Sequence, residues 1–172
     1  MALTVEDGTG LSASDAYISL ADAEDYYLEY EGVAWDATAS DTLKEASIRR
    51  AARYLDGMRW KGERTAKRSQ AMDWPRYGAT DCDGTLIPSN EVPVEIERAN
   101  ALLAFYELAN PGGLDPTVTL GTLAKREKVD VIEVEYRDQA ATVQSSRPVV
   151  TSAQDLIACL VLGNGYGFLK RV

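Results

Sequence analysis

One segment of the chain is bounded firmly enough to fix the kind of fold it belongs to. Pro93 suits the first turn of a helix, and Asn110-Pro111-Gly112-Gly113 stops one. Between them an apolar stripe recurs at helical spacing, with Glu95, Glu97, Arg98 and Glu107 outside it; the stripe is Val94, Ala101, Leu102, Phe105, Leu108 and Ala109. A helix with such a stripe must bury it, so the segment predicts a helical body.

Three more helices are predicted around this one. Ser19 with Asp22 reads as a cap for a helix over 20–30 that ends at Gly32 and carries Tyr26, Tyr27 and Tyr30 on one side. A second helix is expected over 41–56, with Lys44 among its outer residues and a buried stripe of Leu43, Ser47, Ala51, Tyr54, Leu55 and Met58. A last helix is expected from a Ser152 cap to Gly163.

Alternating residues over 129–136 predict a strand, with residues 120–125 as its hairpin partner across Arg126-Glu127. The expected fold is therefore α+β and mostly α: a small bundle of three or four helices with one β-hairpin at about 119–136. We expect one domain over 1–164 and a C-terminal arm over 165–172.

Periodicity disappears between residues 59 and 92, where turn residues surround two tryptophans. We expect this long loop to be ordered and to fold back on the bundle through Trp60, Trp74, Pro75 and Arg76. These residues and Arg64 are candidates for loop architecture first and for contact between subunits second. Asp81-Cys82-Asp83-Gly84 predicts a tight turn, because a calcium loop needs further ligands where Thr85 and Val92 stand.

Composition excludes many kinds of catalytic site. The chain has no histidine, its Gly-rich stretch 163–167 lacks the residues of a phosphate loop, and no nucleophile–base pair stands out. We therefore expect no enzyme, no metal and no cofactor, and a small hydrolase is the weakest alternative. Cys82 and Cys159 have no C-x-x-C partner, so two unpaired thiols are expected, although a disulfide stays open. Without a signal sequence or a run of about 18 apolar residues, we expect a soluble protein made in the cytoplasm with no membrane partner.

Charge is distributed unevenly along the chain. The net charge is −9, yet residues 1–43 hold ten acidic and no basic residues, whereas residues 44–76 hold ten basic and four acidic ones. The basic patch most suited to nucleic acid is Arg59, Lys61, Arg64, Lys67 and Arg68, with Trp60 as a stacking ring. The same patch is also compatible with a solvated loop, or with a surface that meets the acidic region of another copy.

The loop carries motifs that resemble a family of small phage proteins. A W-x-G-x-R element is present at Trp60, Gly62 and Arg64, followed by Gln70-Ala71-Met72-Asp73-Trp74-Pro75-Arg76 and then the D-x-D-G turn. The chain start, Val5-Glu6-Asp7-Gly8-Thr9-Gly10 and Ser14-Asp15-Ala16-Tyr17-Ile18-Ser19, matches as well, as do Ile87-Pro88, Pro93-Val94 and 132–136. The matches span most of residues 3–136.

Two functions are implied by this resemblance. One is a DnaT-like single-stranded-DNA-binding protein, a replication accessory that would use residues 59–76. The other is a head-to-tail connector, a virion protein that forms a ring, commonly of twelve copies, between the portal and the stopper or tail. We favour the connector, because an acidic ring repels the double-stranded DNA that slides through it, whereas a charge of −9 opposes strand binding.

The end of the chain supplies one more candidate interface. Tyr166, Phe168 and Leu169 are apolar residues on a Gly-rich stretch, and Lys170 and Arg171 follow. We expect this arm to dock on a partner, the portal in the connector interpretation, with the alternative that it packs on its own bundle.

Overall fold

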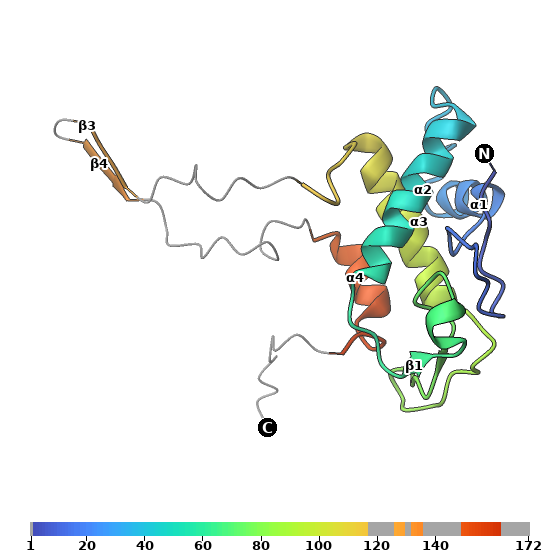
Figure 1. The fold of residues 1–172 in the computed structure, drawn as a ribbon. Helices are drawn as coiled ribbons and strands as arrows, with labels where there is room; N and C mark the ends of the chain where they lie inside the picture. Colours follow the sequence, from blue (N-terminus) through green and yellow to red (C-terminus); the bar gives the residue numbers. More distant parts are fainter. Residues whose placement is uncertain (1, 117–125, 130–131, 136–148, 163–172) are drawn as a thin grey trace.

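The computed structural model describes residues 2–116, 126–129, 132–135 and 149–162. Four helices form the body: α1 (Leu20–Glu31), α2 (Asp41–Asp56), α3 (Val94–Ala109) and α4 (Thr151–Ile157). Helix α3 lies at the centre and packs on each of the other three, most extensively on α2 and α4 (Figure 1). The predicted fold class, a mostly helical α+β domain, is confirmed.

Apolar packing around α3 is tied together by one buried polar side chain. Ile96, Ala99, Leu103 and Ala104 of α3 are fully buried or nearly so. Among them, Asn100 is fully buried, donates from Nδ2 to the Ile48 carbonyl of α2, and accepts from the Tyr17 amide. Because an unpaired buried amide is costly, these bonds fix how α2 and the N-terminal segment sit on α3.

The ends of the first two helices agree with the sequence, but one face of α2 does not. The Ser19 hydroxyl accepts from the Asp22 amide, and Gly32 closes α1 with a φ of 71°. In α2, however, Leu43 is more than half exposed and Lys44 is buried, the reverse of the prediction. Lys44 is buried because its Nζ pairs with Glu24 at 2.7 Å and lies 5.7 Å from the centre of the Trp35 ring, a long-range arrangement.

Helix α3 contains a second buried charge that the sequence placed outside. Glu107 is fully buried, whereas Val94, predicted in the stripe, is 45% exposed. The Glu107 carboxylate accepts from Arg50 Nε at 2.6 Å and from the amides of Gly112 and Leu114. It thus ties the chain that leaves α3 back onto α2, a role that helical periodicity does not reveal.

The predicted last helix and hairpin exist with different bounds. Helix α4 starts at Thr151 with Val150 as its N-cap, so Ser152 lies inside the first turn and makes no cap. The hairpin pairs β3 (Arg126–Val129) with β4 (Ile132–Glu135), so Arg126-Glu127 belongs to a strand and is not the turn. Its register sets Arg126 opposite Glu135 and Lys128 opposite Glu133.

The loop between α2 and α3 is folded. It contains the paired strands β1 (Glu63–Arg64) and β2 (Arg76–Tyr77) and the short 3-10 helix η1 (Lys67–Ser69). One side of it is bonded to the N-terminal segment, where the Ala71 amide donates to the Leu11 carbonyl. The other side is bonded to the chain after α4, where the Leu162 amide donates to the Arg59 carbonyl at 2.7 Å.

A disulfide joins Cys82 of this loop to Cys159, so the expectation of two unpaired thiols is wrong. The two cysteines are 77 residues apart in sequence, and the pairing of Trp60 with Val161 brings their Cα atoms to 5.0 Å. No local sequence pattern indicates that the two cysteines lie close together. Among the described residues, no helix is long and apolar enough to cross a membrane.

Candidate nucleic-acid interface

The two tryptophans of the loop lie in the core. Trp74 is fully buried, Trp60 is 3% exposed, and their rings meet edge to face with centroids 5.9 Å apart. Trp60 Nε1 donates to the Leu55 carbonyl at the end of α2. The prediction that Trp60 stacks on a base is therefore wrong, because its ring has no exposed face.

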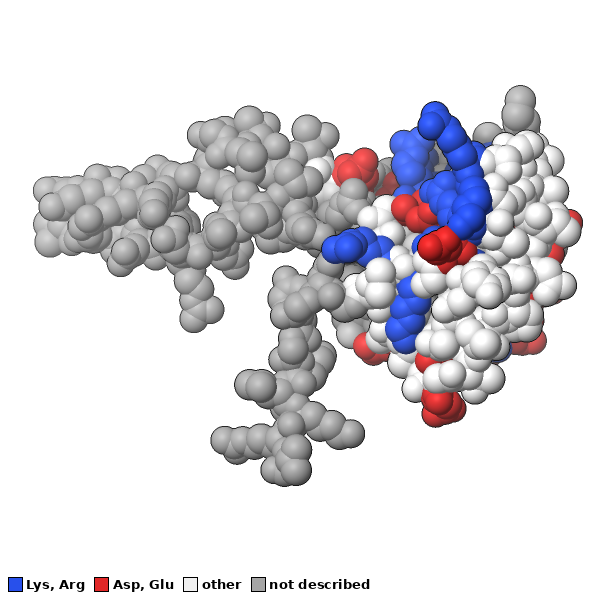
Figure 2. Space-filling view, turned by 60° about the horizontal axis from the view of Figure 1, so that its bottom comes forward, with Lys and Arg blue, Asp and Glu red and all other residues white. Residues whose placement is uncertain are grey.

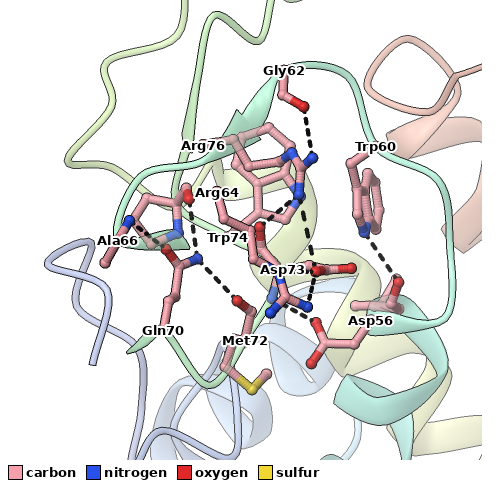
Figure 3. A network of polar contacts seen from close by, with 12 residues as sticks. Asp56, Trp60, Gly62, Arg64, Ala66, Gln70, Met72, Asp73, Trp74 and Arg76 are labelled. Carbon is pink, nitrogen blue, oxygen red and sulfur yellow. Dashed lines mark hydrogen bonds and ion pairs between the residues drawn. The ribbon is translucent and has the colours of Figure 1, made fainter. Parts of the chain in front are cut away.

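Arg76 holds the loop together from inside (Figure 3). Its guanidinium donates to three backbone carbonyls, those of Lys61 and Gly62 at 2.7 Å and that of Asp73 at 3.0 Å. The side chain is only 11% exposed. Because its donors bind the backbone, Arg76 stabilises the shape of the loop and has few donors left for a ligand.

A buried glutamine clamps the next turn. Gln70 accepts from the Ala66 amide and donates from Nε2 to the carbonyls of Met72 and Pro75, as Figure 3 shows. The Trp74–Pro75 peptide bond inside this clamp is cis. The Gln-x-x-x-Trp-Pro-Arg element is thus a structural unit that fixes the position of the basic residues around it.

Beneath the loop, Tyr17, Asp56 and Asp73 form a buried polar group. The Tyr17 hydroxyl donates to Asp56 and accepts from the amides of Asp73 and Trp74. Asp56 also accepts from the Asp73 amide at 3.0 Å. Burial raises the pKa of Asp56 to about 6 and, together with the Asp56 charge, raises the pKa of Tyr17.

Asp73 links this buried group to the surface. Its carboxylate binds Arg64 through Nε at 2.5 Å, and Arg64 remains 37% exposed. An ion pair in this setting orients the guanidinium without removing it from solvent. Arg64 therefore stands at a fixed position on the outside of the loop.

The other predicted basic residues belong to the same loop as Arg64. Arg59, Lys67 and Arg68 are exposed, Lys61 is half-buried, and Lys67 forms an exposed ion pair with Glu63. Figure 2, which turns the loop end of the body in Figure 1 towards the viewer, shows Lys and Arg side chains on this view of the body, with acidic side chains interspersed.

The same loop carries an exposed aromatic residue that the sequence did not single out, on the side of the β1–β2 pair where Glu63 binds Lys67. Tyr77 follows Arg76 in β2, pairs in register with Glu63, and is 71% exposed. In the sequence, Tyr77 stands directly after Trp-Pro-Arg, and only the structure shows that its ring is exposed while Trp60 and Trp74 are buried. We call Arg59, Lys61, Arg64, Lys67, Arg68 and Tyr77 the basic loop face.

Other candidate sites give less. Asp81 accepts from the amides of Asp83 and Thr85, which confirms the predicted turn, and the described residues hold no cluster of metal-ligating side chains. A pocket of about 100 Å³ lies between α2 and the chain after α3, lined by Arg50, Arg53, Tyr54, Glu107, Gly112, Leu114 and Asp115. The predicted arm residues Tyr166, Phe168, Leu169, Lys170 and Arg171 lie outside the described residues.

Comparison with known proteins gives one match. The family model described as "Putative DnaT-like ssDNA binding protein" matches residues 1–172, the whole chain. No curated protein and no solved structure matches the chain significantly. Because the family model matches the chain over its full length, the chain belongs to this DnaT-like family.

Proposed function

We propose that this protein binds single-stranded DNA through the basic loop face. The observation that carries the proposal is that one folded loop presents five basic residues together with the exposed ring of Tyr77, which lies opposite Glu63, the partner of Lys67. The family description points to the same ligand. This choice revises the preference drawn from net charge, because residues 59–76, with six basic and two acidic residues, are locally basic although the whole chain is acidic.

The physical basis is the usual one for strand binding without sequence preference. Lys and Arg neutralise phosphates and release counterions, while a base stacks on an aromatic ring. Arg64 is held by Asp73, and Tyr77 is held by the β1–β2 pair, so neither has to be ordered when DNA binds. Binding is expected to be modest, because Glu63 and Asp73 offset part of the charge and the whole chain is acidic.

Fluorescence anisotropy with a labelled oligo(dT) tests the proposal on the full chain. If four phosphates are neutralised, affinity falls about 20-fold between 50 and 150 mM salt, since each phosphate adds about 0.7 to the salt slope for single strands. The variant Lys67→Ala/Arg68→Ala should lower that slope by about 1.4. Tyr77→Ala should weaken binding by about 1–3 kcal/mol with the slope unchanged.

Glu63→Gln is the matched variant for which the opposite effect on binding is expected. It keeps the size of the side chain, removes the partner of Lys67 and should strengthen binding. Oligonucleotide binding that is absent at 50 mM salt, or unaffected by all three variants, would overturn the proposal.

A second candidate is the head-to-tail connector, and a specific feature of the fold favours it. Among the described elements, β3 and β4 contact each other and no helix. A two-stranded hairpin is marginally stable alone in water, so such a hairpin suits a subunit that packs against partner proteins. In this function, copies form a ring between the portal and the stopper or tail, and double-stranded DNA passes through it.

Electron microscopy of virions distinguishes this candidate from strand binding. A connector is present in purified particles as a ring at the head–tail junction. Its absence from purified particles would exclude the connector function while leaving the strand-binding tests untouched.

A further inference from the structure

The end of α1, the segment after it and the start of α2 carry apolar side chains that nothing in the described structure covers. We call residues 28–43 the acidic corner, because acidic residues accompany these apolar side chains. Leu28, Tyr30, Val33 and Leu43 are each more than half exposed. They are four of the nine large hydrophobic side chains that are exposed in the described residues, gathered within sixteen positions of the sequence. Because exposed apolar side chains that occur together favour a binding role, this segment is a candidate interaction surface.

The corner is held in place from its inner side. Phe105 of α3 meets Tyr27 at 4.5 Å and Trp35 at 4.8 Å between ring centroids, and Tyr26 contacts Tyr30 at 4.5 Å. Lys44 and Glu24 add an ion pair beside Trp35. The corner is therefore part of the packed body, so its exposed side chains are presented on a firm base.

Acidic residues surround the corner. Residues 1–43 contain no base, and the acids exposed around the apolar side chains are Asp25, Glu29, Glu31, Asp36 and Asp41. An apolar centre with an acidic rim selects a partner with an apolar centre and a basic rim.

We infer that this acidic corner binds the basic loop face of a second copy of the chain. The loop offers both properties, because Arg59, Lys67 and Arg68 are exposed on it, and so are the apolar side chains of Tyr77 and Leu86. The two surfaces belong to different parts of the molecule, so the contact is head to tail, and a pair of copies still has one free corner and one free loop face.

This contact uses the face that is proposed to bind DNA, so self-association and strand binding exclude each other. The inference rests on the proposed function only for that competition. The contact itself stands or falls without DNA, and it also supplies the connector candidate with a surface through which copies meet.

Charge reversal in sedimentation velocity tests the contact without DNA. The unmodified chain should associate with rising concentration at low salt. Glu29→Lys/Glu31→Lys should weaken association on the order of ten-fold, as should Lys67→Glu/Arg68→Glu. In a mixture, the unmodified loop face of one variant meets the unmodified corner of the other, and the two reversed surfaces are also complementary, so association between the two variants should return. Asp155→Lys on α4 changes the charge elsewhere and should leave association unchanged.

Leu28→Ser/Leu43→Ser tests the apolar centre, because both side chains are exposed and their replacement spares the core. It should weaken association while oligo(dT) anisotropy stays the same or improves. A mixture of reversed variants that stays monomeric, or corner variants that associate like the unmodified chain, would overturn the inference. Lack of DNA binding with association intact would overturn only the proposed function.

Discussion

At the scale of single residues, Asp56 makes stability depend on pH. Burial raises its pKa from 3.8 to about 6. The folded state favours the protonated form of Asp56. The stability that this protonation contributes is fully present below about pH 3.8 and is lost as pH rises through 6. Asp56→Asn keeps an oxygen for the Tyr17 hydroxyl and the Asp73 amide and cannot ionise. We expect the variant to be more stable than the unmodified chain by about 2 kcal/mol at pH 7.5, with no such gain at pH 4.

Urea denaturation of both chains at several pH values measures this difference. Asp155→Asn, which alters an exposed carboxyl group on α4, serves as the control and should parallel the unmodified chain. An Asp56→Asn difference that is equally large at pH 4 and 7.5 would show that the effect does not come from ionisation.

The two buried tryptophans provide a second comparison between single residues. Trp60 Nε1 donates to the Leu55 carbonyl, whereas Trp74 Nε1 has no hydrogen-bond partner among the described residues. Replacement by Phe removes similar volume at both positions, but only Trp60→Phe also breaks a hydrogen bond. We expect Trp60→Phe to lose about 1 kcal/mol more free energy of unfolding than Trp74→Phe. Equal losses in chemical denaturation would contradict this assignment.

At the scale of elements, the helices were predictable because their signals are local. Pro93, the Ser19 cap and the stop at Gly32 act within a turn of the residues they bound, so the sequence alone predicts α1, α2 and α3 closely. Lys44 and Glu107 were misplaced because their burial depends on Glu24 and Arg50, partners from other elements. The same reason explains the missed disulfide.

The candidate site was predictable only in part. Its basic residues are adjacent in sequence, and their charge needs no structure to be seen. The exposure of the aromatic rings, however, depends on tertiary packing, because Trp60 and Trp74 are buried in the core whereas Tyr77 is exposed. Composition suggests an aromatic partner for the bases, and the fold determines which aromatic it is.

Two glycines of the loop provide a test of how β1 and β2 are packed. Gly62 and Gly78 both have positive φ, 70° and 72°, so alanine is strained at either position. A Cβ on Gly62 would lie 2.4 Å from the Tyr77 carbonyl oxygen and 2.7 Å from the Ala79 amide, whereas a Cβ on Gly78 meets nothing within 4 Å. We expect Gly78→Ala to cost about 1 kcal/mol and Gly62→Ala several times more.

Thermal and urea denaturation of the two alanine variants measure the difference, which is due to sterics because the backbone strain is shared. Gly62→Ala should also displace Tyr77 and weaken oligo(dT) binding beyond the effect of Gly78→Ala. Similar stabilities for the two variants would show that β1 and β2 do not approach as closely as described.

In the whole molecule, the loop between α2 and α3 is hydrogen-bonded to the N-terminal segment and to the segment directly after α4. The N-terminal segment bonds to it through Leu11, and the segment after α4 bonds to it through Leu162. The basic loop face therefore lies on a surface assembled from distant parts of the sequence, and the acidic corner lies on α1 and α2. This separation of charge within one body lets an acidic chain present a basic surface.

The disulfide between Cys82 and Cys159 adds a covalent closure to this arrangement, and its removal tests how far the loop depends on it. A cross-link over 77 residues restricts the unfolded chain strongly, and the chain-entropy account gives about 4.5 kcal/mol for a loop of this length. We expect Cys82→Ser/Cys159→Ser to lose about 3–4 kcal/mol of unfolding free energy. The folded variant should keep the oligo(dT) affinity, because Arg76, Gln70 and Asp73 fix the basic loop face independently of the bond. Reductant should destabilise the unmodified chain to the same extent and leave the double variant unaffected. A variant that keeps full stability but loses binding would show the reverse relation, in which the disulfide shapes the face and contributes little to the fold.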